Sequence, residues 1–242
     1  GGIYRDVEFL IVNKLHFDLD YYGCPGIKYT SQVNGDDATL QVSTYVNKEA
    51  LTADTKVVLS LSDAWGKEVV SAEAAVLGKS EAFDKEAQSN GAENQFTLQV
   101  PNVHLWNGLE DPYLYTLQAR LMKDGQVVDE ISCNCGIRTF AFSPKDGFHL
   151  NGRHYPLHGV SRHQDRKAIG NAISYENMEQ DMELIREVGA NTIRLAHYQH
   201  NQYFYDLCDK YGMIVWAEIP YISEHMPNGR ENTFSQMKEL II

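Results

Sequence analysis

The chain has 242 residues, of which 43% are hydrophobic and 22% are charged, and its 33 acidic residues exceed the 21 basic ones to leave a formal net charge of −12. This composition is typical of a folded chain with enough apolar residues for two modest domains. The negative charge excludes nucleic acid and anionic membrane surfaces as expected partners. No apolar run approaches the roughly 20 residues that a membrane-spanning helix needs, so no membrane role is expected.

The cysteines and the two ends of the chain carry little functional signal. Cys24, Cys133, Cys135 and Cys208 are too few and too irregularly spaced for a disulfide framework or a zinc site, so we expect inert thiols. The first residues lack the basic and apolar segments of a signal peptide. The sequence has no initiator Met and closes on an apparent helix without a stop signal, which predicts a longer protein. The compartment stays open, cytoplasmic or periplasmic for a bacterial protein.

The first part of the chain alternates apolar and polar residues with the period of β-strands, as in residues 38–46 and 56–62. Asp124-Gly125 separates two such runs and predicts a tight hairpin, because both residues tolerate positive φ. Short strands at this spacing, without helices between them, predict an immunoglobulin-like β-sandwich over residues 13–143.

After Ser143 the pattern changes to short apolar strands that alternate with amphipathic helices. The predicted strands cover residues 155–160, 192–195 and 213–217. Repeated βα units indicate a parallel sheet, either doubly wound or an eight-stranded barrel. Because no G-x-G-x-x-G motif follows the first strand, we favour the barrel. A complete barrel takes about 250 residues, so residues 144–242 predict a truncated (β/α)8 TIM barrel that holds only its first three βα units.

Two helices are predicted between these strands. Ser174 can cap the first one, whose Met178, Met182, Ile185 and Val188 form one apolar stripe that Gly189 closes. Gly212 ends the second helix, whose apolar positions are Phe204, Leu207, Cys208 and Tyr211. The acidic run Glu176, Glu179, Asp181 and Glu183 is most simply a solvated helix face.

Polar side chains gather where each predicted barrel strand ends, which is where barrel enzymes place their reactive groups. They are Arg162, His163, Arg194, His197 and Glu218. We therefore expect Arg162, His163, Arg194 and His197 to project into a single pocket the size of a sugar. A structural role is the alternative for each of them: the histidines as partly buried core residues, and Arg194 with Glu218 as an ion pair. No partner is defined for three other histidines, which we interpret as residues without a functional role: His154, His158 and His200.

The second predicted barrel strand and the residues after it resemble a known family. Residues 191–198, continued by residues 205–216, closely resemble the first signature of glycoside hydrolase family 2. Three more segments resemble that family in the right order. Residues 1–7 are similar to the last strand of its N-terminal sugar-binding sandwich, to which we assign residues 1–12. Leu105-Trp106 with residues 112–115 resembles the end of its immunoglobulin-like domain, and residues 157–163 resemble its first barrel strand.

The resemblance implies a retaining, exo-acting enzyme. The pair Arg162-His163 is similar to the β-galactosidase branch, because β-glucuronidases usually carry Lys-His there, so terminal β-galactosides are the expected substrates. By the same resemblance, His163 and His197 contact sugar hydroxyls. Arg162 and Glu218 are further expected substrate-binding residues. Arg194 is expected to hydrogen-bond the nucleophilic carboxylate. Such contacts tighten as the oxocarbenium-like transition state forms.

Some expected features are absent from the sequence. The family's acid/base residue lies in an Asn-Glu pair on a later strand, and no Asn-Glu follows Trp216 in this sequence. Both catalytic carboxylates are therefore expected downstream. This chain alone is expected to be inactive. The family pattern also has a small residue in place of Leu195 and Pro in place of Gln199. Some β-galactosidases bind magnesium through a Glu-x-His motif, where this chain has Ile222-Ser223-Glu224. Since Ile cannot ligate a cation, no cofactor is expected.

Other functions stay open. Within the family the alternative is a β-glucuronidase or another glycosidase. A metal-dependent barrel hydrolase would use His163, His197, His200 and Glu218 as ligands. A Ser161 nucleophile lacks the G-x-S-x-G elbow. The non-enzymatic alternative is a carbohydrate-binding or spacer module. A homo-oligomer of the full-length enzyme is compatible with the sequence.

Overall fold

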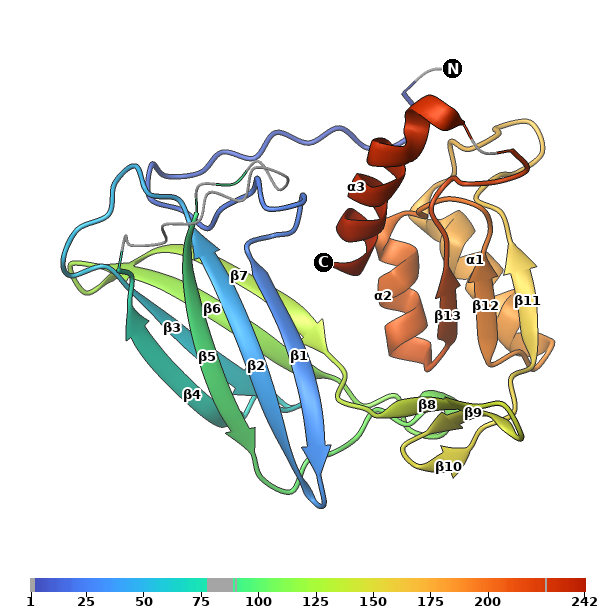
Figure 1. Ribbon diagram of the computed structural model, residues 1–242, viewed down its shortest axis with the longest axis horizontal. Coiled ribbons are helices and arrows are strands. Elements are labelled where there is room, and N and C mark those ends of the chain that lie inside the picture. Colours follow the sequence, from blue (N-terminus) through green and yellow to red (C-terminus); the bar gives the residue numbers. More distant parts are fainter. Residues whose placement is uncertain (1–2, 78–88, 90, 225) are drawn as a thin grey trace. The chain divides into compact units, whose positions relative to one another are not determined.

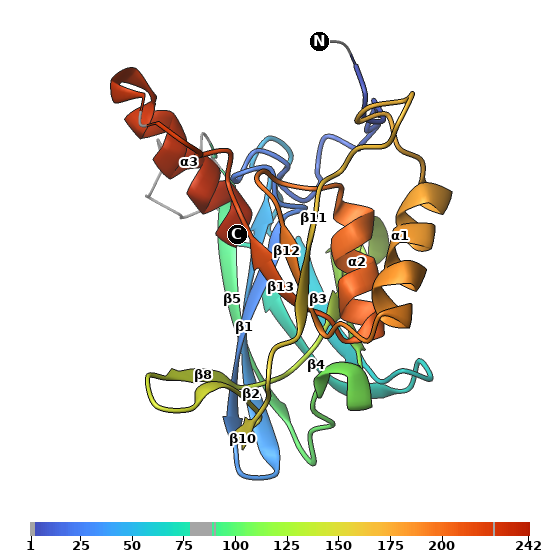
Figure 2. The same ribbon diagram turned by 90° about the vertical axis from the view of Figure 1, so that its right-hand side faces the viewer.

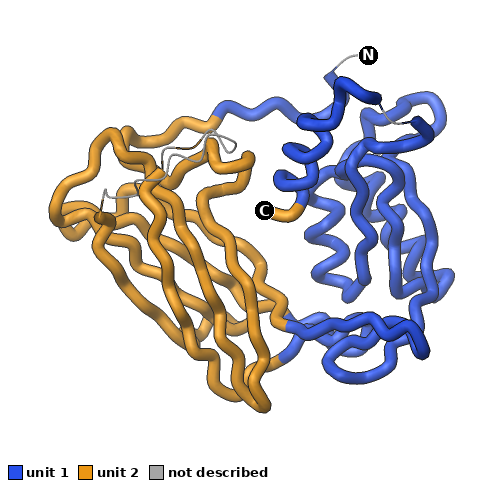
Figure 3. The backbone as a smooth tube through the Cα atoms, in the orientation of Figure 1, with its two compact units in different colours: residues 1–9, 105–113, 138–240 blue, residues 10–104, 114–137, 241–242 orange. Residues whose placement is uncertain are grey.

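The computed structural model describes residues 3–77, 89, 91–224 and 226–242. The chain divides into two compact units, shown in Figure 3. Unit 1 holds residues 1–9, 105–113 and 138–240, and unit 2 holds residues 10–104, 114–137 and 241–242. Among the described residues, no helix is long and apolar enough to cross a membrane.

Unit 2 is the predicted two-sheet sandwich (Figure 1). One sheet has the order β1-β2-β5 and the other β4-β3-β6-β7, and all neighbouring strands are antiparallel. The bounds are Ile27–Asn34 (β1), Asp37–Val46 (β2), Lys56–Ser62 (β3), Glu68–Ala75 (β4), Ala92–Val100 (β5), Tyr115–Lys123 (β6) and Gln126–Cys135 (β7). Strands β2 and β3 confirm the two runs predicted from their alternation.

Local sequence accounts for several features of the sandwich. Every second residue of β5 is buried, because successive side chains of a strand point to opposite faces. Asp124 and Gly125 have φ angles of 48° and 72° and join β6 to β7, so the predicted hairpin is confirmed. Burial raises the pKa of the Cys133 thiol to about 11 and that of Cys135 to about 12, which keeps both protonated.

Unit 1 contains the start of the barrel. Its parallel sheet has the order β11-β12-β13, and a separate antiparallel sheet has the order β10-β9-β8. Helices α1 and α2 cover one face of the parallel sheet (Figure 2), and their apolar side chains form a common core with it. The bounds are Phe140–Ser143 (β8), Gly147–Leu150 (β9), Arg153–His154 (β10), Gly159–Arg162 (β11), Thr192–Leu195 (β12), Ile214–Ala217 (β13), Tyr175–Glu187 (α1), Gln202–Tyr211 (α2) and Arg230–Ile241 (α3), with 3-10 turns Gly108–Glu110 (η1) and Pro227–Gly229 (η2).

The helix ends follow the predicted signals. Ser174 and Asn177 form a reciprocal capping box at the start of α1. Gly212 ends α2 in the left-handed conformation with φ 76°. Val188 is an exception, because it caps α1 and is exposed rather than part of the buried stripe.

The first barrel strand is shorter than predicted. It begins at Gly159 instead of Tyr155, since Pro156 has no N–H for strand pairing. Asn191 holds this irregular stretch: its Oδ1 accepts from the His158 N–H at 2.7 Å and its Nδ2 donates to the Pro156 carbonyl at 2.8 Å. The side chain of Asn191 thereby joins the entry to β11 to the start of β12.

The compact units divide the chain differently from the predicted boundaries, because residues 105–113 pack against α2 and against residues from Arg138 onward. Trp106 is 2% exposed, and its indole N–H donates to the Asp209 carbonyl of α2 at 2.9 Å. The guanidinium of Arg138 lies 5.0 Å from the centre of the indole ring. A Cβ at Gly212 would overlap the Gly108 carbonyl, so glycine is needed there for this close approach.

The N-terminal segment also belongs to unit 1. The described residues from Ile3 to Phe9 form no strand, since a strand requires a hydrogen-bonded neighbour and none pairs with them. Arg5 donates to the Gln199 carbonyl at 2.5 Å, and Asp6 accepts from the Tyr175 hydroxyl at 3.1 Å. The assignment of residues 1–12 to a preceding sandwich stays a prediction.

Candidate functional site

Arg194, His197 and Glu218 meet at the carboxyl ends of β12 and β13. Arg194 donates from Nε to Glu218 Oε1 at 2.6 Å and from Nη2 to Oε2 at 3.2 Å, a bidentate pair. The Nδ1 of His197 lies 3.0 Å from Glu218 Oε2. The sequence prediction that these strand ends converge is correct for these three residues.

The charges in this group are mutually stabilised. The hydrogen bond from Arg194 lowers the pKa of Glu218, burial opposes the shift, and the hydrogen bond from His197 adds to it. Glu218 is therefore ionised at neutral pH. Arg194 Nη2 lies 3.0 Å from His197 Nδ1. Both nitrogens have a hydrogen-bond acceptor when Nη2–H and Nδ1–H each donate to the Glu218 carboxylate. In that tautomer His197 Nε2 is an acceptor.

A pocket of about 430 Å³ opens beside this group. It is lined by Arg194, His197, Ala217, Glu218, Ile219, Tyr221, Ile222, Thr233 and Met237. A volume of this size suits a small ligand such as one sugar ring. Tyr221 and the α3 residues Thr233 and Met237 could not be placed in the pocket from the sequence, since their contribution depends on where the chain turns after β13.

His163 lies at the same rim. Its ring is 5.1 Å from that of His197, edge to face, and 6.3 Å from that of Tyr198. The imidazole is exposed, so it is available to a ligand above the strand ends. Of the four side chains expected to share one pocket, Arg194 and His197 line it, whereas His163 lies next to His197 but is not among the lining residues.

Arg162 does not join them, and its expected placement in the pocket is wrong. In the sheet Ser161 pairs with Arg194, whereas Arg162 pairs with Leu195. Because side chains alternate between faces, Arg162 lies on the side of Leu195, toward the helices. Its side chain is 5% exposed, and its guanidinium carbon lies 3.8 Å from the centre of the Phe204 ring in α2.

The partners of Arg162 correct two further interpretations. Its Nε and Nη2 donate to Asp181 Oδ2 at 3.0 and 2.8 Å, so this carboxylate belongs to a partly buried ion pair and not to a solvated helix face. Arg166 donates to the other oxygen of Asp181 at 2.6 Å. Arg162 Nη1 lies 2.9 Å from Nδ1 of His200, which is buried and has a partner that the sequence did not define.

Gln164 and Tyr198 lie in the loops of the rim, and their hydrogen bonds were not predicted from the sequence. The buried Gln164 accepts from the Asn201 N–H at 2.7 Å, and its own N–H donates to the Tyr198 hydroxyl at 3.1 Å. These bonds join the loop after β11 to the loop after β12.

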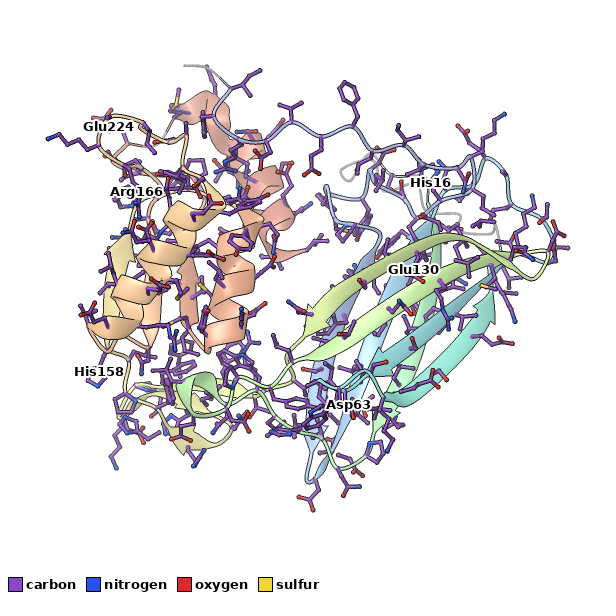
Figure 4. All side chains as sticks on the ribbon, turned by 180° about the vertical axis from the view of Figure 1, so that it is seen from behind. His16, Asp63, Glu130, His158, Arg166 and Glu224 are labelled. Atoms are coloured by element: carbon purple, nitrogen blue, oxygen red, sulfur yellow. The ribbon has the colours of Figure 1, made fainter. Side chains whose placement is uncertain are left out.

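His158 lies at the opposite end of unit 1 from Arg166 and Glu224 (Figure 4), which agrees with its interpretation as a residue without a functional role.

The residues do not fit a metal centre. Ile222 lines the pocket with a hydrocarbon side chain where a magnesium ligand would be needed. Both ring nitrogens of His200 are engaged, with Arg162 and with the Ala196 carbonyl. Within the described ranges, no group of three His, Cys, Asp or Glu side chains is arranged to hold a metal ion.

His200 makes the stability of unit 1 sensitive to acid. Burial lowers its pKa from 6.5 to about 4, and the charge of Arg162 adds to the shift, while the hydrogen bond to the Ala196 carbonyl opposes it. Because the folded pKa lies below the ordinary one, the neutral ring contributes stability above pH 6.5 that is lost as the pH falls through 4. This contribution is roughly 3 kcal/mol.

Urea unfolding at pH 7 and pH 4 of the wild type and of the His200→Gln variant checks this expectation. The free energy of unfolding of the wild type should fall more on acidification, by roughly the amount above, because Gln does not titrate. An equal fall in both proteins would contradict it.

Comparison with known proteins agrees with this architecture. Residues 25–138 match the family model of glycosyl hydrolases family 2, and residues 144–239 match that of the family 2 TIM barrel domain. A β-glucuronidase of Bacteroides fragilis is 37% identical over 253 residues, which cover 100% of this chain and 35% of that protein. A β-galactosidase of Bacteroides ovatus is 34% identical over 220 residues, covering 90% of this chain and 24% of that protein.

A solved structure is similar in the same region. The crystal structure of an FMN-binding β-glucuronidase from Faecalibacterium prausnitzii L2-6 has a TM-score of 0.83 and 41% identity, and covers 95% of this chain and 33% of that one. This chain therefore spans about a third or less of the length of these relatives. With an immunoglobulin-like sandwich followed by the start of a TIM barrel, each matching the corresponding family model, the chain belongs to glycoside hydrolase family 2.

Proposed function

We propose that the full-length protein is a retaining exo-β-glycosidase that acts on terminal β-glucuronides, with terminal β-galactosides as the second candidate. The observation that carries the proposal is the group of Arg194, His197 and Glu218 at the strand ends, beside a pocket of about 430 Å³. In this proposal the pocket binds the non-reducing sugar residue, and His163 and His197 contact its hydroxyl groups.

Arg194 is suited to orient a nucleophilic carboxylate. Its Nε and Nη2 are used by Glu218. In the described part of the chain its Nη1 has no hydrogen-bond partner, so it can donate to a second carboxylate in the pocket. A guanidinium next to a carboxylate keeps that group ionised, as a nucleophile requires.

The two carboxyl groups that perform the reaction are proposed to lie outside these 242 residues. Retaining glycosidases need them roughly 5 to 5.5 Å apart. Among the residues that line the pocket, Glu218 is the single carboxylate. Its lowered pKa and its bond to Arg194 make it unsuited to donate a proton.

The chain alone is therefore expected to be inactive. Purified as 242 residues, it should release no nitrophenol from nitrophenyl β-glycosides, because the acid/base and nucleophile are missing. Turnover that persists after repurification from a host without such enzymes would contradict the proposed position of the catalytic carboxylates.

The preference between the two sugars changes once the structure is known. The Arg162-His163 pair resembles that of β-galactosidases, but Arg162 faces α1 and α2 and does not line the pocket. Its identity therefore cannot select the sugar by contact. The relatives named above include two β-glucuronidases and one β-galactosidase, which supports β-glucuronides as the first candidate.

The test compares two substrates with the full-length protein. The kcat/KM values for nitrophenyl β-D-glucuronide and nitrophenyl β-D-galactoside are measured under the same conditions. A clear preference for the glucuronide supports the first candidate, and the reverse order supports the second. Hydrolysis of neither substrate would contradict both.

A further inference from the structure

The Arg162 network consists of Arg162, Asp181, Arg166 and His200, and lies behind the rim of the candidate site. Arg162 and His200 are both buried, with exposed fractions of 6% and 4%. Buried ion pairs add little to stability, since desolvation offsets the attraction, and apolar replacements of similar size are often as stable. The groups that the network touches indicate a second role for Arg162 and His200, besides stability.

The network ends on the peptide that precedes His197. Arg162 Nη1 is a donor only, so Nδ1 of His200 accepts, and Nε2–H of His200 must donate to the Ala196 carbonyl, 3.1 Å away. The Ala196 N–H donates to the carbonyl of Arg162 at 3.0 Å. Both polar backbone atoms of Ala196 are thus held by Arg162, one directly and one through His200.

The next residue, His197, bears the imidazole of the candidate site. Its Nδ1 lies 3.0 Å from Glu218 Oε2, and its ring lies 5.1 Å from that of His163. A shift of the Ala196 backbone would move this imidazole relative to both groups. Within the described ranges, Asp181 and Arg166 share no hydrogen bond with His200 or with the Ala196 peptide, and Arg166 binds α1 through Asn177 and Gln180.

We infer that Arg162 and His200 are positioning residues that hold the Ala196 backbone and thereby aim the imidazole of His197 at the bound sugar. The inference rests on the proposed glycosidase function for its kinetic consequence. The contact of His197 with the sugar strengthens in the transition state, so loss of its alignment lowers kcat more than it raises KM.

The kinetic test uses the full-length protein and whichever nitrophenyl β-glycoside it hydrolyses best. His200→Leu removes both hydrogen bonds and should lower kcat about 100-fold, the effect of a misplacement of about 1 Å, with little change in KM. His200→Gln keeps one acceptor and one donor and should recover most of the activity. Arg166→Met is the matched control, because it removes a cation from Asp181 without touching His200, and should keep wild-type kcat.

Arg162→Lys keeps the charge beside Asp181 but cannot donate to Asp181 and His200 in the geometry of a guanidinium. It should lower kcat as His200→Leu does, and it decides the kinetic test if the Leu variant does not fold. Wild-type kcat in the folded variants of Arg162 and His200, or an equal fall in Arg166→Met, would overturn the inference.

A structural arm separates this inference from the proposed function. In a crystal structure of His200→Leu, or of Arg162→Lys, the His197 Nδ1 to Glu218 Oε2 distance should exceed the 3.0 Å of the wild type. An unchanged Ala196 backbone and an unchanged distance would overturn the positioning role. If the wild-type protein hydrolyses no glycoside, the proposed function fails, and the crystal structures alone decide the inference.

Discussion

Replacing Arg194 with Met in the full-length protein is expected to lower kcat/KM by roughly 100- to 1,000-fold, as loss of one preorganised donor in an active site does. Arg194 gives two hydrogen bonds to Glu218, at 2.6 and 3.2 Å, and the proposed third one to the nucleophile. Met has a similar length but no charge, so it leaves Glu218 without its guanidinium partner. Steady-state kinetics with the preferred nitrophenyl β-glycoside measure the effect.

Arg153→Met is the matched control for that variant. Arg153 is an exposed arginine that pairs with Glu110 at 3.2 Å, and exposed pairs of this kind contribute little. It should retain wild-type kcat/KM and thermal stability. An Arg194→Met protein that is folded and as active as this control would show that Arg194 takes no part in the reaction.

Replacing Trp106 with Ala is expected to have the largest effect on stability, about 3–5 kcal/mol. The indole is 2% exposed, donates to the Asp209 carbonyl at 2.9 Å and lies under the guanidinium of Arg138. Its loss leaves a cavity in unit 1 and removes the hydrogen bond from residue 106 to α2. Urea or thermal unfolding of the purified protein measures the change in the free energy of unfolding.

Trp65→Ala is the corresponding control, because Trp65 is 82% exposed. Surface substitutions usually change stability by less than about 0.5 kcal/mol. Equal unfolding midpoints for the two tryptophan variants would contradict the structural role assigned to Trp106.

Much of the fold could be predicted because it depends on neighbours in sequence. The Asp124-Gly125 hairpin, the Ser174 cap and the Gly212 helix end are local features, and each is found where it was expected. Strand β11 begins at Gly159 and not at the predicted Tyr155, because Pro156 has no N–H for strand pairing.

The candidate site was predicted in part for the same reason. Arg194, His197 and Glu218 lie in or directly after the carboxyl ends of two neighbouring parallel strands, and parallel strands bring these ends to one edge. The pocket residues of α3 could not be foreseen, because their distance from β12 is set by the path of the chain between residues 218 and 233.

By itself, the sequence determined the order of strands and helices, their caps and turns, and the family signature around Arg194. The tertiary structure alone decided which arginine faces the pocket and which one is buried. Arg162 and Arg194 both lie near strand ends, but only the packing of α1 and α2 distinguishes the two faces of the sheet. The partners that hold Arg162 in place lie 19 and 38 residues further along the chain, in Asp181 and His200, and no local pattern encodes contacts at those separations.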